Sequence, residues 1–163
     1  MKSPGPDHPI TVSRHPNRVR VLFQGHMIAE TAGALTLAEA SYRPVIYVPR
    51  QDVALEYLSR TDSHTHCPYK GDAAYYTIMR DGDVAQDAVW TYEHPYPAVG
   101  EIRGFLAFYP DQVIIEETPL GAGPNVDEIG RAEEPGQTQA WTAPQSPDHA
   151  LKVGRPYKDT GAL

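Results

Sequence analysis

The chain contains a single cysteine, Cys67, among its 163 residues, so no internal disulfide bond can form. Long apolar runs are also missing, since no stretch approaches the roughly 18 residues of a membrane span. The first residues, MKSPGPDHPITV, lack the apolar run of a signal peptide. Together these features predict a protein of a reducing compartment, and we expect it in the cytoplasm without a membrane partner.

Positive charge is sparse. The 14 basic side chains are outnumbered by 21 acidic ones, which gives a net charge of −7 at pH 7, and no segment of the chain is basic. Nucleic-acid-binding proteins cluster lysine and arginine because the neutralisation of phosphates dominates their affinity. We therefore expect no nucleic-acid partner.

Composition divides the chain into three parts, and its length suits one domain. Residues 1–17 hold four prolines and predict an irregular arm. Residues 18–117 predict a single β-rich domain. Residues 118–163 hold six prolines and six glycines without a clear period, and predict an irregular tail. We expect this tail to pack on the domain or on a partner through Trp141, Leu151 and Tyr157.

Alternation of polar and apolar residues predicts most of the strands. RVRVLFQ and HMIAET flank Gly25 and predict a hairpin over 18–31. The turn DGD separates two further strands, and Pro110-Asp111 separates another pair. The predicted strands beyond the first hairpin are 44–49, 72–80, 84–93, 102–109 and 112–117.

Two segments are less regular. ALTLAEA is compatible with a strand over 35–39 or with a short helix. QDVALEYLSR places Val53, Ala54, Tyr57 and Leu58 at helical spacing, which predicts an amphipathic helix of about two to three turns over 51–60. The predicted fold is therefore mainly β, with compact antiparallel sheets, one short helix and a long irregular tail.

The densest cluster of reactive side chains is HTHCPYKG, from His64 to Gly71, which we place in a loop before the strand with Tyr75 and Tyr76. Together with RVRVLFQGHMIAET, YVPRQDV, DAVWTYEHP and GFLAFYPDQV, the motif THCPYKGDAAYY resembles the family named domain of unknown function 427. The resemblance covers residues 18–117. It implies a compact, mostly antiparallel β-fold related to the β-tent folds. The family is sometimes labelled a nucleotidyltransferase, and no activity is established for it.

Three residues are candidates for catalysis: Cys67, Lys70 and Glu39. Cys67 is a nucleophile if His66 or Lys70 favours its thiolate, and otherwise a small buried apolar residue. Lys70 either binds an anion or closes the loop together with Gly71. If 35–39 is a strand, Glu39 points inward, and its carboxylate needs a partner in Arg50 or Lys70. It then serves either as an internal ion pair or as a general acid or base.

Aromatic residues on three predicted strands suggest a ligand pocket. We expect Tyr47, Tyr76, Trp90 and Tyr92 to line it, with Arg50 and Lys70 orienting an anionic group. Alternation places Tyr75 and Tyr76 on opposite faces, and Trp90 and Tyr92 on the same face.

No metal site or cofactor is predicted. His64, His66 and Cys67 form a possible ligand set with His26 or His94, but His66 and Cys67 are adjacent, unlike the ligands of structural zinc. We interpret the two loop histidines as exposed.

Three functional hypotheses follow. The first is a small-molecule-binding domain, with or without enzymatic activity on an anionic metabolite. The second is a non-catalytic interaction module that forms a homodimer through its tail. The third is nucleotidyl transfer, which the family label implies. That chemistry uses paired carboxylates on Mg²⁺, and Asp81 and Asp83 have such a spacing but occupy a predicted hairpin turn.

Overall fold

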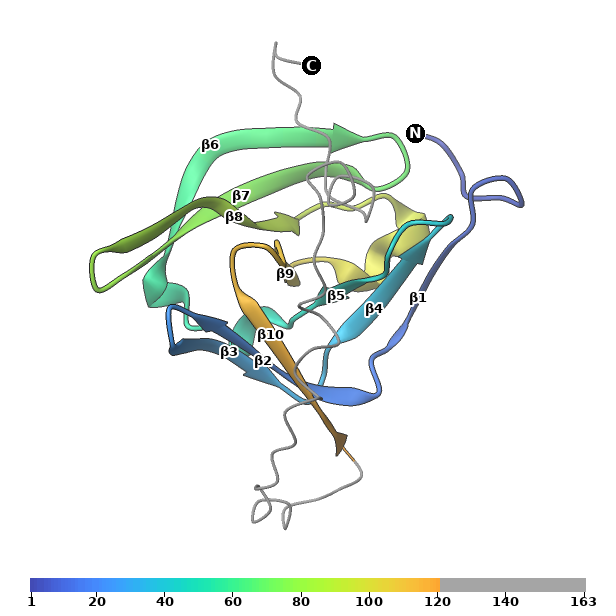
Figure 1. The fold of residues 1–163 in the computed structure, drawn as a ribbon. Helices are drawn as coiled ribbons and strands as arrows, with labels where there is room; N and C mark the ends of the chain where they lie inside the picture. The colour runs from blue at the N-terminus through green and yellow to red at the C-terminus, as the bar shows by residue number, and fades with distance from the viewer. Residues whose placement is uncertain (121–163) are drawn as a thin grey trace.

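The computed structural model describes residues 1–120, which fold into three antiparallel sheets linked by short turns and 3₁₀-helices (Figure 1). The mainly β fold class with compact antiparallel sheets is therefore confirmed. The strands are β1 (Ile10–Arg14), β2 (Asn17–Phe23), β3 (His26–Thr31), β4 (Leu35–Glu39), β5 (Val45–Tyr47), β6 (Leu58–Cys67), β7 (Gly71–Arg80), β8 (Asp83–Tyr92), β9 (Leu106–Phe108) and β10 (Ile114–Pro119). The 3₁₀-helices are η1 (Arg50–Asp52), η2 (Leu55–Tyr57) and η3 (Pro97–Ile102).

The strand order is β10-β2-β3 in one small sheet, β1-β4-β5 in the other, and β6-β7-β8-β9 in the largest. In Figure 1 the long strands β6, β7 and β8 arch over the two small sheets. Two isolated bridges add to these sheets: Val48, directly after β5, pairs with Leu106 of β9, and Ala29 of β3 pairs with Val53 between η1 and η2. The three sheets therefore enclose a common interior.

The predicted hairpin over 18–31 is confirmed as β2 and β3. Val19, Val21 and Phe23 are buried, while the residues between them face outward, which is the period of two that the sequence displays. A bulge follows Val21 and shifts the register of the pair.

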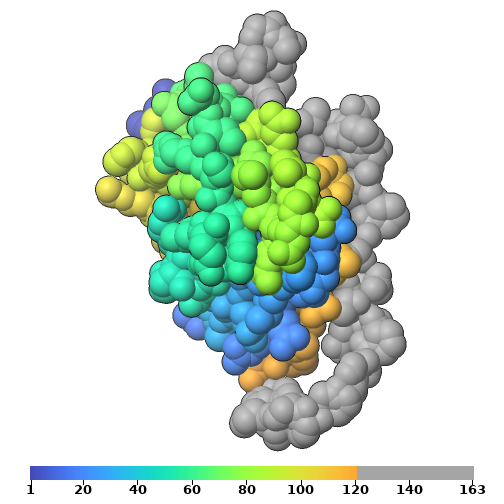
Figure 2. Space-filling model, turned by 90° about the vertical axis from the view of Figure 1, so that its left-hand side faces the viewer, coloured from blue at the N-terminus to red at the C-terminus, as the bar shows by residue number. Residues whose placement is uncertain are grey.

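The hairpin predicted on either side of DGD is confirmed as β7 and β8. Asp81 and Gly82 at its turn have φ values of +51° and +87°, as a type I′ turn requires. His26 Nε2 lies 3.0 Å from Asp81 Oδ2, so this turn contacts the turn between β2 and β3. Figure 2 shows the two hairpin tips side by side, in blue and yellow-green.

The interior is divided into two apolar clusters. The first is mostly aliphatic and lies over β2 and β3, and the second is rich in aromatic residues and lies over β4, β5 and η3. Strands β7, β8 and β9 contribute to both clusters from their two faces. Tyr76 belongs to the first cluster and Tyr75, Trp90 and Tyr92 to the second, which confirms the predicted alternation.

The helix expected over 51–60 is replaced by η1 and η2. Between them Val53 is extended, pairs with Ala29 and is buried, and Leu58 begins β6 opposite Ile78. A helix of so few turns is marginal by itself, so pairing with two strands outweighs the helical spacing of the apolar residues.

Two other expectations are wrong. Residues 102–109 and 112–117 do not form a hairpin, because β9 pairs with β8 and β10 pairs with β2. The arm predicted over 1–17 is not wholly irregular, since Ile10–Arg14 form β1 against β4. Prolines flank this segment but leave its backbone N–H groups free to pair. The tail prediction lies almost entirely outside the described residues, apart from residues 118–120.

Gly71 at the start of β7 has a φ of +107°, and a Cβ there would lie 3.4 Å from the carbonyl oxygen of His94. We expect Gly71→Ala to lower the free energy of unfolding by about 1–2 kcal/mol, because an L-residue is strained at this φ. Urea denaturation measures this change. Gly100→Ala is the control, since φ there is outside the left-handed region and a Cβ has open space. An equal loss in both variants contradicts the argument from strain.

Candidate functional site

Glu39 ends β4 with its side chain pointing inward and only 4% of its surface exposed. The alternation Leu35, Leu37, Glu39 places it there, so the strand alternative for 35–39 is correct. Its Oε1 accepts a short hydrogen bond from Lys70 Nζ, and its Oε2 lies 2.7 Å from His8 Nε2. Of the two partners expected for Glu39, the structure provides Lys70.

Lys70 lies in the turn between β6 and β7 and is 2% exposed. Backbone hydrogen bonds fix this turn, from Lys70 N to the oxygen of Cys67 and from Tyr96 N to the oxygen of Lys70. An ammonium group taken out of water needs a charged partner, and Glu39 supplies it. Lys70 therefore binds the carboxylate of Glu39, and its buried ammonium group is not exposed to bind an anion from solution.

His8 is the accessible member of the cluster, with 21% of its side chain exposed. Its ring stacks on Tyr69 with centroids 3.9 Å apart, and Tyr42 contacts it edge-on. Lys2 Nζ lies 5.9 Å from the Tyr69 ring. Within residues 1–120, Nδ1 of His8 makes no hydrogen bond. We call His8, Glu39 and Lys70 the relay.

His8 is not predicted from the sequence, because it lies in the proline-rich segment whose composition predicts an irregular arm. The available signal was the stretch ITVSR that follows it. As a strand paired with 35–39, this stretch places Ile10 opposite Glu39 and thus brings His8 near the carboxylate.

Cys67 ends β6 opposite Gly71 and is half-buried. The motif HTHCPYKG is therefore not a loop, because His64 to Cys67 continue β6, and only the residues before Gly71 turn the chain. This correction follows from the pairing of His64 and Thr65 with Ala74 and Ala73. The Cys67 carbonyl oxygen accepts a hydrogen bond from the backbone N–H of Lys70. The Cys67 thiol makes no hydrogen bond within the described residues.

Three of the predicted aromatic residues lie together in the second cluster beside the relay. Trp90 Nε1 donates a hydrogen bond of 3.3 Å to Tyr47 Oη. Burial raises the pKa of Tyr47 and of Tyr92 well above the ordinary value, and the negative charge of Glu39 adds to the shift in both. The Tyr92 hydroxyl is fully buried and has no hydrogen-bond partner among the described residues.

Tyr76 and Arg50 do not belong with this group. Tyr76 lies in the other apolar cluster, and Arg50 is exposed and donates a hydrogen bond of 3.3 Å to Tyr76 Oη. The pocket expected from all four aromatic residues is therefore not one site, because β7 turns Tyr76 to the opposite face from Tyr75.

Comparison with known protein families identifies the family of this chain. Residues 11–118 match the family described as domain of unknown function DUF427. The chain belongs to the DUF427 family. A search of curated proteins finds no match. The family recognised from the sequence motifs is thus confirmed, and the matched segment contains Glu39 and Lys70, while His8 precedes it.

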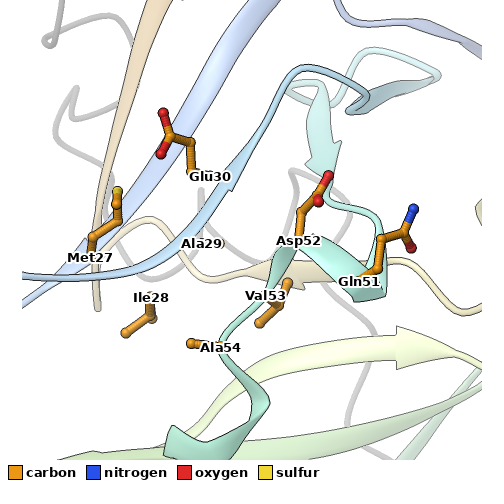
Figure 3. Close-up of a pocket in the computed structure, with 8 residues that line it drawn as sticks. All are labelled: Met27, Ile28, Ala29, Glu30, Gln51, Asp52, Val53 and Ala54. Carbon is orange, nitrogen blue, oxygen red and sulfur yellow. The ribbon is translucent and has the colours of Figure 1, made fainter.

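A shallow groove of about 310 Å³ runs along β3 of the DUF427 domain. Figure 3 shows the residues that line it, Met27, Ile28, Ala29 and Glu30 on one side and Gln51, Asp52, Val53 and Ala54 on the other. None of the predicted site residues is among them. Its ionisable side chains are both acidic, so the groove does not suit an anionic ligand.

Metal ligands do not converge in the part of the DUF427 domain that the structure describes. Among residues 1–120 no group of three histidine, cysteine, aspartate or glutamate side chains has the geometry to hold an ion. His66 instead lies 2.7 Å from Asp72 at an exposed position. In the same part of the chain, no helix has the length and apolar character needed to cross a membrane.

Proposed function

We propose that this DUF427 protein is a small-molecule-binding domain that uses the relay as an acid–base centre toward an anionic ligand. One observation carries the proposal. The buried carboxylate of Glu39 binds a buried ammonium group through one oxygen and a partly exposed imidazole through the other.

The three residues of the relay have different roles, and together these roles suit proton transfer. A carboxylate that accepts a hydrogen bond from one ring nitrogen fixes the orientation of an imidazole and leaves the other nitrogen for chemistry. Histidine is the side chain best suited to exchange protons near neutral pH. In the relay, Glu39 orients His8, Lys70 balances the charge of Glu39, and Nδ1 of His8 exchanges a proton with the ligand.

An anionic ligand is favoured by the positive charge beside His8. The ammonium group of Lys2 lies over the ring of Tyr69, which stacks on His8. The backbone N–H of Lys2 donates a hydrogen bond to the carbonyl oxygen of Pro68. The ammonium group of Lys2 and a protonated His8 then attract the same anionic group. In this proposal Lys2 orients the anionic group, the role that the sequence predicts for Lys70 and Arg50.

Ring signals of His8 followed by NMR test the proposal, with inorganic phosphate, acetate and ATP as probes. We expect at least one probe to shift the His8 signals in a saturable way. Isothermal titration calorimetry then compares the variants, and we expect His8→Gln to weaken the binding of that probe at least tenfold. His66→Gln is the matched control, because His66 also pairs with a carboxylate but lies at an exposed position. Equal binding by both variants, or no binding of any probe, overturns the proposal.

The two other hypotheses receive less support. Nucleotidyl transfer needs converging carboxylates, whereas Asp81 lies in the β7–β8 turn and contacts His26. Oligomerisation through residues 118–163 stays a prediction, because nearly all of that segment lies outside the described residues.

A further inference from the structure

A second histidine–carboxylate cluster lies at the opposite end of β1 from His8. His15 follows β1 and is 8% exposed. Its Nδ1 lies 2.6 Å from Thr36 Oγ1 on β4, and its Nε2 lies 2.7 Å from Glu117 Oε1 on β10. Asn17 Nδ2 also donates to this carboxylate oxygen, over 2.8 Å. The residue that follows β1, the neighbouring strand β4 of the same sheet and β10 of another sheet thus bring an imidazole, a hydroxyl and a carboxylate together.

The hydrogen-bond network assigns the proton on the imidazole. An ionised carboxylate only accepts hydrogen bonds, so the proton of a neutral His15 lies on Nε2, toward Glu117. Nδ1 then carries a lone pair and accepts the hydrogen bond from the Thr36 hydroxyl. This is the order of hydroxyl, base and carboxylate in which a side-chain hydroxyl becomes a nucleophile.

The hydroxyl of this cluster is at its accessible end. Thr36 is half-buried, whereas His15 and Glu117 are buried. Ser13 on β1 is exposed and lies directly opposite Thr36 in the strand register. Such cross-strand neighbours have Cβ atoms about 4.5–5.5 Å apart. The Ser13 hydroxyl is therefore near enough to donate a hydrogen bond to the carbonyl oxygen of an ester that Thr36 attacks, where negative charge develops.

We propose that Thr36, His15 and Glu117 form an acyl-transfer centre that hydrolyses esters of small carboxylic acids. Thr36 Oγ attacks the ester carbonyl carbon while its proton passes to Nδ1 of His15. The bond from the carbonyl carbon to the alcohol oxygen breaks, and His15 returns the proton to that oxygen. Water then attacks the acyl-threonine in the same way, which releases the acid and restores Thr36.

This centre is separate from the relay. Thr36 and Glu39 lie three positions apart on β4 and therefore point to opposite faces of the strand. The two sites share no residue, so each is tested without the other.

The test uses the full chain with Cys67→Ser as background, since a thiol would itself react with the probe, p-nitrophenyl acetate. We expect a burst of about one nitrophenolate per chain and an acetyl group on the peptide that contains Thr36. Thr36→Val should abolish both, and Thr36→Ser should retain them. Ser41→Ala, an exposed position outside the cluster, should behave as the background protein.

Glu117→Gln provides a second measurement should the Thr36→Val variant fail to fold. We expect it to slow acetylation at least about 100-fold, because the imidazole loses the carboxylate that fixes its tautomer. Circular dichroism shows whether each variant retains its β-structure. Absence of a burst in the background protein, a burst unchanged by Thr36→Val, or an acetyl group only on other residues overturns the proposal.

Discussion

Replacing Lys70 by methionine is expected to lower the free energy of unfolding of the DUF427 domain by about 3–5 kcal/mol. Lys70 and Glu39 are 2% and 4% exposed, so the substitution leaves a carboxylate in the interior without its ammonium partner. Only His8 then remains to compensate the charge. Methionine has nearly the volume of the lysine side chain, so the loss reflects charge and not a cavity. Urea denaturation at neutral pH measures the effect.

Arg60→Met is the control for Lys70→Met. Arg60 donates hydrogen bonds of 2.6 Å and 3.1 Å to Glu93, and these hold the pKa of Glu93 below its ordinary value, but both side chains are exposed. We expect a loss of less than about 1 kcal/mol there. Adding Glu39→Gln to Lys70→Met should recover part of the stability, because it removes the uncompensated charge. A loss in Lys70→Met no larger than in Arg60→Met refutes the prediction.

Alkaline conditions are expected to destabilise the protein steeply through Tyr47 and Tyr92. Burial raises the pKa of both hydroxyls above the ordinary value of 10.0. Below pH 10 both tyrosines are protonated in the folded and in the unfolded chain, so stability does not depend on them. Above pH 10 the unfolded chain releases these protons and the folded protein retains them, so stability falls as the pH rises toward the folded pKa values.

The expected slope is about 1.4 kcal/mol per pH unit for each tyrosine, and thus about 2.7 kcal/mol per unit for the two together. Urea denaturation at a series of pH values on both sides of 10 measures it. Tyr92→Phe and Tyr47→Phe should each remove about half of the slope, while Tyr42→Phe, at an exposed position, should leave it unchanged. An unchanged slope in Tyr92→Phe contradicts the prediction.

Local patterns in the sequence were sufficient for the hairpins. Alternation in 18–31 and the turn Asp81-Gly82 are contained in a few consecutive residues, so β2–β3 and β7–β8 could be predicted. The segment 51–60 could not, because its apolar spacing suits a helix equally well, and the pairing of Val53 with Ala29 decides its structure. The partners of β9 and β10 are likewise set by distant strands and not by the turn between them.

The candidate site shows the same limit. The inward direction of Glu39 follows from its own strand, and its need for a partner follows from burial, so Lys70 could be named among two candidates. His8 could not, since its contact with Glu39 depends on the pairing of β1 with β4. Glu117 lies 102 positions from His15 in the chain, and no local pattern connects them.

The two-faced packing of β7 and β8 has a consequence for changes in chain length. Because Tyr75 and Tyr76 belong to different clusters, a one-residue insertion in β7 would exchange the aromatic and aliphatic sets along the rest of the strand. A strand with one face in water tolerates such a slip on that face, but here both faces meet packed side chains. Insertions and deletions in this hairpin should therefore be tolerated only at its turn, which makes Asp81-Gly82 the place to insert a tag or a reporter peptide without disturbing the interior.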